Sequence, residues 1–519
     1  MIKRFGVILF AMAALAALPS SAATCASLAT LQLPDTTIAT AQSVPAGPFT
    51  SGDRPVRVAV EFCRVAMVLK PSVDSDIHVE IWLPSTGWNG KFQGIGNGGF
   101  AGSIDLAALA ASVAHGYAAA STDTGHHAGG TDASWALNHP EKIADFGYRA
   151  IHETVSRAKA IIFAFYGEAP KRSYFNACSN GGRQALMEAE RYPADYDGII
   201  AGAPADYWTH LLTTAIYNLQ AVSAPGSAIA ASKLPAIEAA ALAACDARDG
   251  VKDGVIENPA QCRFDPGVLL CKGAETDACL TAPQIAAIRK IYGGSKTSKG
   301  EQILPGFSPG GEAEPGDWGA WITGGRGPSE MESYGTNFFK YMVYNDAAWD
   351  FKTSTTDHNV KLADDKLALT LNATDPDLKK FESRGGKLIL YHGWSDAAIP
   401  PQNTIDYYQS VVKKMGSKDA ATFVRLFMVP GMGHCSGGPG PNVFGQAGVP
   451  RSDPDHDIDA ALERWVEQGA APEQVIASKF KAGSNPPVAE RTRPLCAYPQ
   501  TAHWKGSGST DEAANFVCK

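Results

Sequence analysis

The sequence predicts an α/β fold with a mostly parallel central sheet flanked by helices and a large inserted segment. Short apolar or alternating stretches, which are typical of strands, are each followed by a stretch with helical spacing. This rhythm stops after Pro204 and resumes at residue 387. Residues 206–374 between these points are rich in glycine, proline and aromatic residues and contain four of the ten cysteines. We therefore expect them to form a separate, loop-rich unit.

The expected elements follow from the local patterns of the chain. Strands are expected at 56–62, 77–83, 117–123, 173–177, 198–201, 387–391 and 423–429, and helices at 145–165, 182–191 and 457–468. Each expected strand is short and rich in apolar residues, and glycine or proline interrupts the chain near several of its ends. Alternation of strands with helices favours parallel pairing over a meander of hairpins.

The first residues of the chain resemble a signal peptide. Lys3 and Arg4 precede the apolar stretch Phe5–Leu18, and the small residues Ser21–Ala23 offer a cleavage site. We expect residues 1–23 to be removed on export, so that the mature protein is secreted or periplasmic. Outside the leader the chain has no apolar run long enough to span a membrane, so no membrane association is expected after cleavage.

Composition excludes one class of partner and indicates disulfides. Hydrophobic residues make up 45% and charged residues 19% of the chain, and the net charge is −8. This acidic balance lacks the basic footprint of a protein that binds nucleic acid. All ten cysteines follow the leader, and an even number in an exported chain favours disulfide bonds over free thiols. Their pairing remains open at this point, as does the oligomeric state.

Residues 174–184 carry the first chemical signal. They read Tyr-Phe-Asn-Ala-Cys-Ser-Asn-Gly-Gly-Arg-Gln, so that a short strand runs into Ser179 and then into glycines and a helix. A nucleophilic serine needs such a tight turn, because small neighbours allow the strained backbone that exposes its hydroxyl. A serine that merely caps the following helix is the alternative. Ala177 stands where the Gly-x-Ser-x-Gly pattern has its first glycine, and Gly181 keeps the second.

Two later loops supply an acid and a base in the order expected after a nucleophilic serine. Asp396 follows the expected strand 387–391, and His434 lies in a glycine-rich turn after the expected strand 423–429. His392 is the competing base, but it is too close to the end of its strand. Three loops in the order Ser, Asp, His predict an α/β-hydrolase fold with Ser179, Asp396 and His434 as the catalytic triad. Cys178 and Cys435 adjoin the serine and the histidine, and a bridge between them would hold these two residues together.

On these motifs the sequence resembles the tannase and feruloyl esterase family of α/β-hydrolases over nearly the whole mature chain. The motifs are Cys-Ser-x-Gly-Gly-Arg at 178–183, Tyr-Asp-Gly-Ile at 196–199, Ala-Gly-Ala-Pro at 201–204, His-Gly-Trp-Ser-Asp at 392–396 and Gly-Met-Gly-His-Cys at 431–435. Mono(2-hydroxyethyl) terephthalate hydrolase is similar on the same fold. The family usually has glycine before the Cys-Ser pair, where this chain has Ala177.

The resemblance implies a set of covalent and domain features. It implies the disulfides Cys178–Cys435, Cys25–Cys63, Cys245–Cys262, Cys271–Cys279 and Cys496–Cys518. It also implies a catalytic domain in two parts, at 24–205 and 375–519, with a lid domain at 206–374 between them. The backbone N–H groups of Asn180 and of Gly98 or Gly99 would form the oxyanion hole.

The resemblance further implies a structural calcium ion in the lid. Residues 245–256 contain three carboxylates within eight residues, separated by glycines. By spacing alone these would be turns on a solvated loop, because the pattern is not that of an EF-hand. Carried over from the family, the ligands are the carboxylates of Asp246, Asp249 and Asp253 and the carbonyls of Val251 and Val255. No organic cofactor is expected.

We expect a serine esterase that releases a hydroxycinnamic acid of the feruloyl type from a small aromatic ester, either free or attached to polysaccharide, through an acyl-enzyme intermediate. Aromatic residues at 318–344 would stack on the acyl group or form the lid core, and Arg326 would meet a carboxylate or a phenol, or be a surface charge. Galloyl esters and terephthalate monoesters are the alternative substrates. A non-catalytic secreted binding module is a remote alternative, and the chain has no HExxH motif of a metallohydrolase.

Overall fold

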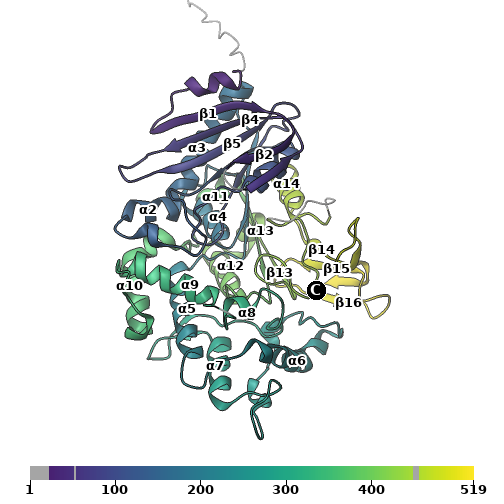
Figure 1. The fold of residues 1–519 in the computed structure, drawn as a ribbon. Helices are drawn as coiled ribbons and strands as arrows, with labels where there is room; N and C mark the ends of the chain where they lie inside the picture. Colours follow the sequence, from purple (N-terminus) through teal and green to yellow (C-terminus); the bar gives the residue numbers. More distant parts are fainter. Residues whose placement is uncertain (1–22, 52–53, 326, 448–454) are drawn as a thin grey trace, which may run out of the picture.

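The centre of the protein is a nine-stranded sheet. A computed structural model of the chain describes residues 23–51, 54–325, 327–447 and 455–519, so the predicted leader lies almost entirely outside the described residues. The strand order is β1-β4-β5-β7-β6-β8-β9-β12-β13 (Figure 1). These strands are β1 (Thr36–Val44), β4 (Phe62–Leu69), β5 (Ile77–Pro84), β6 (Lys91–Ile95), β7 (Ala118–Thr122), β8 (Arg172–Cys178), β9 (Gly198–Gly202), β12 (Lys387–Gly393) and β13 (Val424–Val429). From β7 to β13 the pairing is parallel, whereas β1, β4, β5 and β7 pair antiparallel, so the predicted mostly parallel sheet is confirmed.

One predicted strand is wrong. Residues 56–62 do not form a single strand, because the chain bends at residues 59–60. The first part belongs to β3 (Arg54–Val58), which pairs with β2 (Gly47–Ser51) in a separate hairpin. Phe62 is already the first residue of β4. The alternation of apolar and polar residues continues through the bend, so the sequence pattern alone did not reveal it.

Helices cover both faces of the sheet. On one face lie α3 (Ala150–Tyr166), α4 (Asn180–Arg191) and α12 (Pro401–Met415), and on the other lie α1 (Leu106–Ala114) and α14 (Ile458–Gln468). Successive strand residues therefore face opposite cores. Ile199 of β9 packs with the first set of helices, and its neighbour Ile200 packs with α14. Burial on both faces explains why the central strands read as continuous apolar runs.

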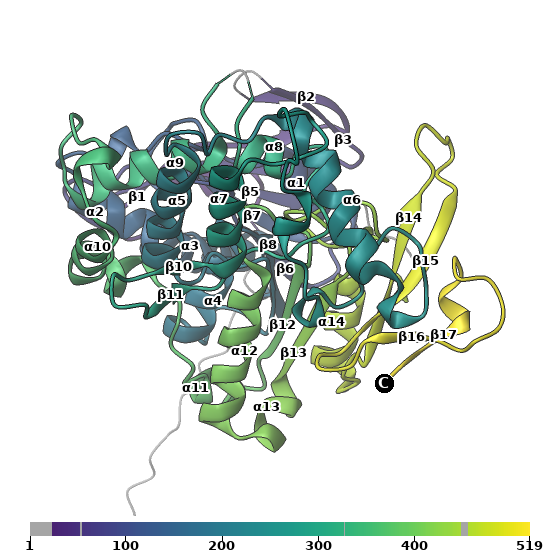
Figure 2. The ribbon, with the colours of Figure 1, turned by 90° about the horizontal axis from the view of Figure 1, so that it is seen from below.

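The segment between β9 and β12 forms a helical layer beside the sheet. Its helices are α5 (Trp208–Val222), α6 (Leu234–Cys245), α7 (Ala282–Gly293), α8 (Trp318–Trp321), α9 (Glu330–Asn337), α10 (Thr356–Leu371) and α11 (Lys379–Ser383). A short hairpin, β10 (Ser295–Lys296) with β11 (Gln302–Leu304), accompanies them. Apart from α11, which lies beside α4, these helices gather in the lower half of Figure 1, and Figure 2 shows α5, α7 and α9 side by side. We call residues 206–374 the lid and keep its boundaries as a prediction.

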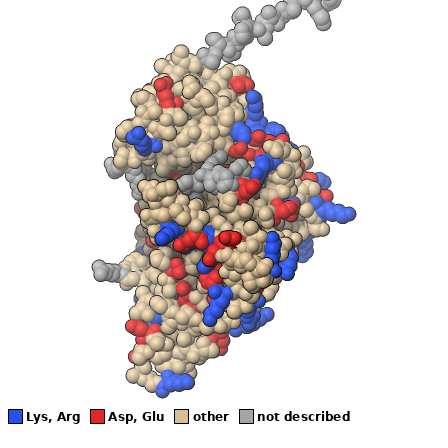
Figure 3. Space-filling model, turned by 90° about the vertical axis from the view of Figure 1, so that its right-hand side faces the viewer, with Lys and Arg blue, Asp and Glu red and all other residues tan. Residues whose placement is uncertain are grey.

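The remaining elements are short. They are α2 (Pro140–Ala144), a π-helical turn (Asp145–Arg149) before α3, α13 (Ser417–Phe423), and two C-terminal hairpins, β14 (Gln474–Phe480) with β15 (Ala489–Cys496) and β16 (Ala502–Trp504) with β17 (Phe516–Cys518). On the face shown in Figure 3, acidic and basic side chains are interspersed, so this face presents no basic stripe. None of the helices in the described part of the chain is long and apolar enough to cross a membrane.

Candidate active site

A sharp turn between β8 and α4 presents Ser179. Its backbone has φ 68° and ψ −126°, a strained conformation for a residue other than glycine, and its side chain makes no capping hydrogen bond to the helix. The alternative of a simple N-cap serine is therefore disfavoured. The glycines of the motif are required by close packing. A Cβ atom on Gly181 would lie 2.6 Å from the Cβ of Ala177, and one on Gly182 would lie 2.3 Å from the carbonyl oxygen of Gly202.

The structure brings together the three residues that the sequence singled out. His434 Nε2 lies 2.9 Å from Ser179 Oγ, and His434 Nδ1 lies 2.7 Å from Asp396 Oδ2. Asp396 follows β12 and His434 follows β13, so the carboxyl ends of neighbouring parallel strands place both side chains beside the turn after β8. With Nδ1 donating to the carboxylate, Nε2 is left to accept from the serine hydroxyl. This is the geometry of a nucleophile, a general base and a residue that orients the base.

Asp396 is held as a carboxylate by more partners than the sequence indicated. It is 1% exposed, and its Oδ1 accepts hydrogen bonds from the backbone N–H groups of Ala398 (2.7 Å) and Ile399 (2.8 Å). His392 Nε2 lies 3.1 Å from Oδ2, the oxygen that also contacts His434. Burial acts to raise the pKa of Asp396, but the two imidazoles outweigh it and hold the pKa well below its usual range. The carboxylate therefore stays ionised throughout the pH range in which histidine titrates.

His392 was expected only as a rejected candidate for the base. Its Nδ1 lies 2.7 Å from Thr404 Oγ1 and its Nε2 faces Asp396, so both ring nitrogens already have partners other than Ser179. The side chain is fully buried. Its position four residues before Asp396, at the end of a strand, is the one signal in the sequence that could have identified it as a second partner of the carboxylate.

The cavity beside Ser179 is mostly apolar. It offers about 520 Å³ of free space, part of it open to solvent, and none of the described residues that line it is charged. Its apolar wall includes Leu211, Leu212, Phe307, Met331 and Ile399. Polar residues are few, with Thr214 and Tyr334 among them, and the Thr214 hydroxyl already bonds His210 and Ser295. Such a cavity suits an uncharged acyl group with one or two polar substituents.

The aromatic residues at 318–344 divide between the two roles considered for them. Trp321 and Tyr334 line the cavity, and their rings stack with centroids 5.8 Å apart. Trp321 also contacts the candidate base. The centroids of the Trp321 and His434 rings lie 5.2 Å apart, with an interplanar angle of 71°. Trp318, Phe338 and Phe339 are instead fully buried in the lid core, and Tyr341 and Tyr344 pack against that core. Arg326 lies outside the described residues.

Donors for an oxyanion lie next to Ser179. Asn180 is the first residue of α4, so its backbone N–H has no acceptor within the helix. Gly99 lines the same cavity, whereas Gly98 is not among the lining residues. A side chain at Gly99 is excluded, because its φ is 56° and a Cβ atom would lie 2.4 Å from the carbonyl oxygen of Gly130. The backbone of Gly99 thus approaches the backbone of Gly130 more closely than a larger residue would allow.

All ten cysteines are paired. The disulfides are Cys25–Cys63, Cys178–Cys435, Cys245–Cys262, Cys271–Cys279 and Cys496–Cys518, the pairs that the resemblance implies. Five disulfides are typical of proteins that fold in an oxidising compartment. They agree with the export that the leader predicts.

The predicted calcium loop is tightly folded around its carboxylates. Asp246 accepts hydrogen bonds from the backbone N–H groups of Asp253 (3.2 Å) and Gly254 (3.1 Å). Asp249 accepts one from Val251 (2.9 Å), and Asp253 accepts one from Val255 (3.2 Å). Each carboxylate thus fixes part of the loop and retains further lone pairs for a cation.

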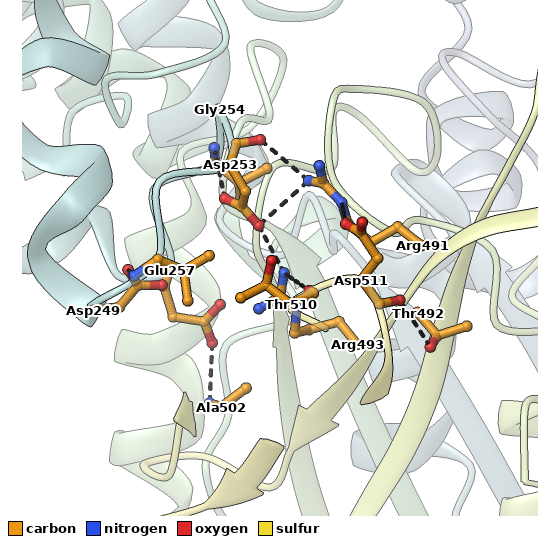
Figure 4. Close-up of polar contacts among 12 residues, drawn as sticks. Asp249, Asp253, Gly254, Glu257, Arg491, Thr492, Arg493, Ala502, Thr510 and Asp511 are labelled. Atoms are coloured by element: carbon orange, nitrogen blue, oxygen red, sulfur yellow. Dashed lines mark hydrogen bonds and ion pairs between the residues drawn. The ribbon is translucent and has the colours of Figure 1, made fainter. Parts of the chain in front are cut away.

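The surroundings of this loop are shown in Figure 4. Asp253 Oδ2 lies 2.7 Å from Arg493 and 3.3 Å from Arg491, both on β15, and Glu257 accepts a hydrogen bond from the backbone of Ala502. Burial raises the pKa of Asp249, and the negative charge of Asp253 adds to this. Among the described residues no three His, Cys, Asp or Glu side chains already form a metal-binding cluster. The oxygen-only donor set and the repulsion that a cation would relieve fit Ca²⁺, which remains a prediction.

Comparison with known proteins identifies the family. The model of the family described as tannase and feruloyl esterase matches residues 63–519. The chain belongs to this family. It is 46% identical to an uncharacterized esterase of Xanthomonas campestris pv. campestris, with 98% of this chain and 93% of that protein covered. It is 35% identical to a probable feruloyl esterase B-2 of Aspergillus terreus, with 98% and 97% covered.

A solved feruloyl esterase has the same architecture. The crystal structure of feruloyl esterase B from Aspergillus oryzae superposes with a TM-score of 0.89 at 29% identity, covering 95% of this chain and 99% of that one. The predicted α/β-hydrolase fold is therefore confirmed, and the protein is a carboxylic ester hydrolase.

Proposed function

We propose that the protein is an exported serine esterase that cleaves esters of hydroxycinnamic acids such as ferulic acid. The contact between His434 Nε2 and Ser179 Oγ, at 2.9 Å, is the observation that carries the mechanism. His434 removes the hydroxyl proton as Ser179 attacks the ester carbonyl, and Asp396 fixes the imidazole and stabilises its positive charge. The proton then passes from His434 to the leaving alcohol, and water releases the acid from the acyl-enzyme.

The tetrahedral intermediate carries a negative charge on the former carbonyl oxygen. The backbone N–H of Asn180 and that of Gly99 would hold this oxygen, since both residues line the cavity next to Ser179. Gly98 is the less favoured donor, because it lies outside the lining. Losing one such donor typically lowers the rate by roughly 10²–10³-fold.

The apolar cavity supports the choice of acyl group. A feruloyl group offers an aromatic ring, an alkene and a methoxy group to apolar walls, and only one phenol needs a polar partner. A galloyl group has three hydroxyls to satisfy, and burying an unpaired hydroxyl costs about 1–3 kcal/mol. The carboxylate of a terephthalate monoester would need a cation, and the described lining residues include none, while Arg326 lies outside the described residues. Trp321 and Tyr334 are positioned to stack on the ring.

A turnover panel tests this proposal. Purified mature protein would be assayed with methyl ferulate, methyl gallate and mono(2-hydroxyethyl) terephthalate, with Ser179→Ala as the control. We expect the highest kcat/KM on ferulate and no turnover by the variant. A preference for gallate or for the terephthalate ester would overturn the substrate, and undiminished turnover by a folded Ser179→Ala protein would overturn the mechanism.

We also propose that Ca²⁺ binds the loop formed by residues 246–255 and acts structurally. Asp246, Asp249, Asp253 and the carbonyls of Val251 and Val255 would hold it. The ion would relieve the repulsion between Asp249 and Asp253 and would fix the loop against β15, to which Arg491 and Arg493 already connect it. The loop contributes no residue to the cavity beside Ser179, so the ion would not enter the reaction.

A further inference from the structure

Arg183 is a buried arginine whose described partners are all neutral. It lies on the first turn of α4, is fully buried, and donates to the backbone carbonyls of Gly147 (2.7 Å), Phe146 (3.2 Å) and Leu371 (3.3 Å). Its guanidinium lies 4.9 Å from the centroid of the Phe146 ring and 5.2 Å from that of Trp208. Burial lowers the pKa of Arg183 to about 9. Because removing a cation from water is costly, a buried arginine without an acidic partner calls for a specific role.

Its fourth acceptor lies beside the nucleophile. Arg183 Nε donates to Asn180 Oδ1 at 2.9 Å. A guanidinium can only donate, so the carboxamide must turn its oxygen toward Arg183 and its NH₂ group away. The contact with Arg183 therefore occupies the oxygen of the Asn180 carboxamide and leaves its NH₂ group for other partners.

The NH₂ group of Asn180 has no partner within the described protein. Its Nδ2 atom is buried and makes no hydrogen bond, although Asn180 is only 1% exposed. An unsatisfied buried donor costs about 1–3 kcal/mol, so such groups usually meet a ligand or a bound water. Asn180 lines the cavity together with Ser179, and the ester must enter that cavity to react.

We propose that the Asn180 carboxamide donates a hydrogen bond to the reacting ester and that Arg183 is the positioning residue that orients it. The acceptor is an ester oxygen that gains negative charge when Ser179 attacks, so the side chain of Asn180 supplements the donor from its own backbone. This inference rests on Ser179 being the nucleophile. It is independent of the acyl group, because every ester substrate presents the same oxygens.

Arg183 also connects this donor to the lid. Leu371 is the last residue of α10, and Trp208 is the first residue of α5, so both ends of the lid contact the guanidinium. The two other carbonyls belong to the π-helical turn at Asp145–Arg149. Arg183 therefore contacts α4, the π-helical turn, α5 and α10. A displacement of the lid helices α5 and α10 would leave the Asn180 carboxamide less firmly oriented.

Substitutions at Asn180 test the donor directly. Kinetics with p-nitrophenyl acetate avoid any dependence on the acyl group. Asn180→Ala removes the NH₂ group, and Asn180→Asp removes it while keeping an acceptor for Arg183. We expect kcat to fall about 10–100-fold in both variants, with KM changed less than about threefold, because the bond strengthens as charge develops on the ester. A folded Asn180→Ala or Asn180→Asp protein with the kcat of the wild type would overturn the proposal.

A double-mutant cycle tests the positioning role. If Arg183 acts through Asn180, Arg183→Met lowers kcat about tenfold in the wild type but less than about twofold in the Asn180→Ala background. If the double variant loses kcat by the product of the two single-variant losses, Arg183 does not act through Asn180 and the positioning role is overturned. Arg191→Met is the matched control, because Arg191 also bonds the lid helix α10, at Leu369, but lies about 16 Å along α4 from Asn180. We expect it to keep the kcat of the wild type.

Folding of each variant is checked by its thermal unfolding. If Arg183→Met does not fold, the Asn180 variants still decide whether the amide contributes. Failure of the proposed function can be told apart from failure of this inference. Turnover by Ser179→Ala would show that Ser179 is not the nucleophile, whatever the Asn180 variants do.

Discussion

Cys178 and Cys435 form a disulfide that joins the neighbour of Ser179 to the neighbour of His434. Their Cα atoms lie 5.9 Å apart, although 257 positions separate them in the sequence. Two strands, β9 and β12, lie between the strands that carry them. The disulfide thus spans the part of the sheet edge from which the nucleophile and the base both project.

We expect the Cys178→Ala/Cys435→Ala variant to lose activity out of proportion to its loss of stability. Without the covalent link, the turn after β8 and the loop after β13 can move independently, and a displacement near 1 Å can cost about 100-fold in rate. Steady-state kinetics and thermal unfolding measure the two effects. Cys496→Ala/Cys518→Ala removes a disulfide of the C-terminal hairpins and should lower stability with little change in kcat. Equal kcat losses in both variants would argue against a role at the site.

The second histidine on Asp396 should also affect the rate. His392→Leu removes the donor at 3.1 Å from Oδ2 and leaves the carboxylate less firmly oriented toward His434. We expect kcat/KM to fall about tenfold, in line with the loss of one hydrogen bond to a charged group. His392→Gln keeps an N–H donor near the same place and should retain more than about a third of the activity. Equal activities for the two variants would show that the contact with Asp396 has no kinetic role.

Trp321 should contribute to aromatic substrates more than to small ones. Its ring lines the cavity and meets His434 edge-on at 5.2 Å. We expect Trp321→Ala to raise KM for methyl ferulate about tenfold and to change KM for p-nitrophenyl acetate less than about threefold, since aromatic contacts are worth about 0.5–1.5 kcal/mol beyond their buried area. Trp88→Ala, which removes a ring stacked on Tyr166 away from the cavity, is the control. An equal rise for both esters would contradict the assignment of Trp321 to the acyl site.

The sequence predicted the parts of the fold whose local pattern is unambiguous. The short strand, the small residues and the helix around Ser179 define a turn that few other structures need, and the loops of Asp396 and His434 follow clear apolar strands. The bend at residues 59–60 was missed because alternation runs through it. β1 was missed because its residues are largely polar or half-buried, as befits an edge strand.

Features that depend on tertiary contact were beyond the sequence. The spacing of His392 and Asp396 only hints at their contact, and nothing in the sequence indicates that Trp321 of the lid reaches His434. The division of the aromatic residues into core and cavity wall likewise depends on how α8 and α9 pack. For these residues only the three-dimensional arrangement distinguishes a structural from a functional role.

The proposed calcium ion should stabilise the lid without changing the chemistry. We expect the melting temperature to rise by several degrees when millimolar CaCl₂ replaces EGTA, because a ligand that binds only the folded state adds about 2.7 kcal/mol at 100 times its Kd. Asp249→Asn should abolish most of this difference. Asp265→Asn, which breaks an exposed ion pair with Arg289 elsewhere in the lid, should leave it unchanged. Equal melting temperatures of the wild type in calcium and in EGTA would contradict the calcium site.

A buried carboxyl group behind the histidine loop should make stability depend on pH. Asp317 is 4% exposed, and its oxygens lie against Gly433, since a Cβ atom there would be 2.8 Å from Oδ1. Burial raises the pKa of Asp317 to about 8, and the negative charges of Asp396, Glu314, Glu238 and Glu312 add to this. The folded protein therefore holds a proton that the unfolded chain releases near pH 4.

The sign of the effect follows from this proton. Between about pH 4 and pH 8 the folded state binds one proton more than the unfolded state, so this group lowers the free energy of unfolding as the pH rises. An asparagine side chain does not titrate, so Asp317→Asn should gain stability over the wild type from pH 5 to pH 8, by several degrees in melting temperature, and gain no more above pH 8. Glu301→Gln, at an exposed lid position that is not among the charges acting on Asp317, is the control. A constant difference between Asp317→Asn and the wild type across this range would show that Asp317 is ionised throughout.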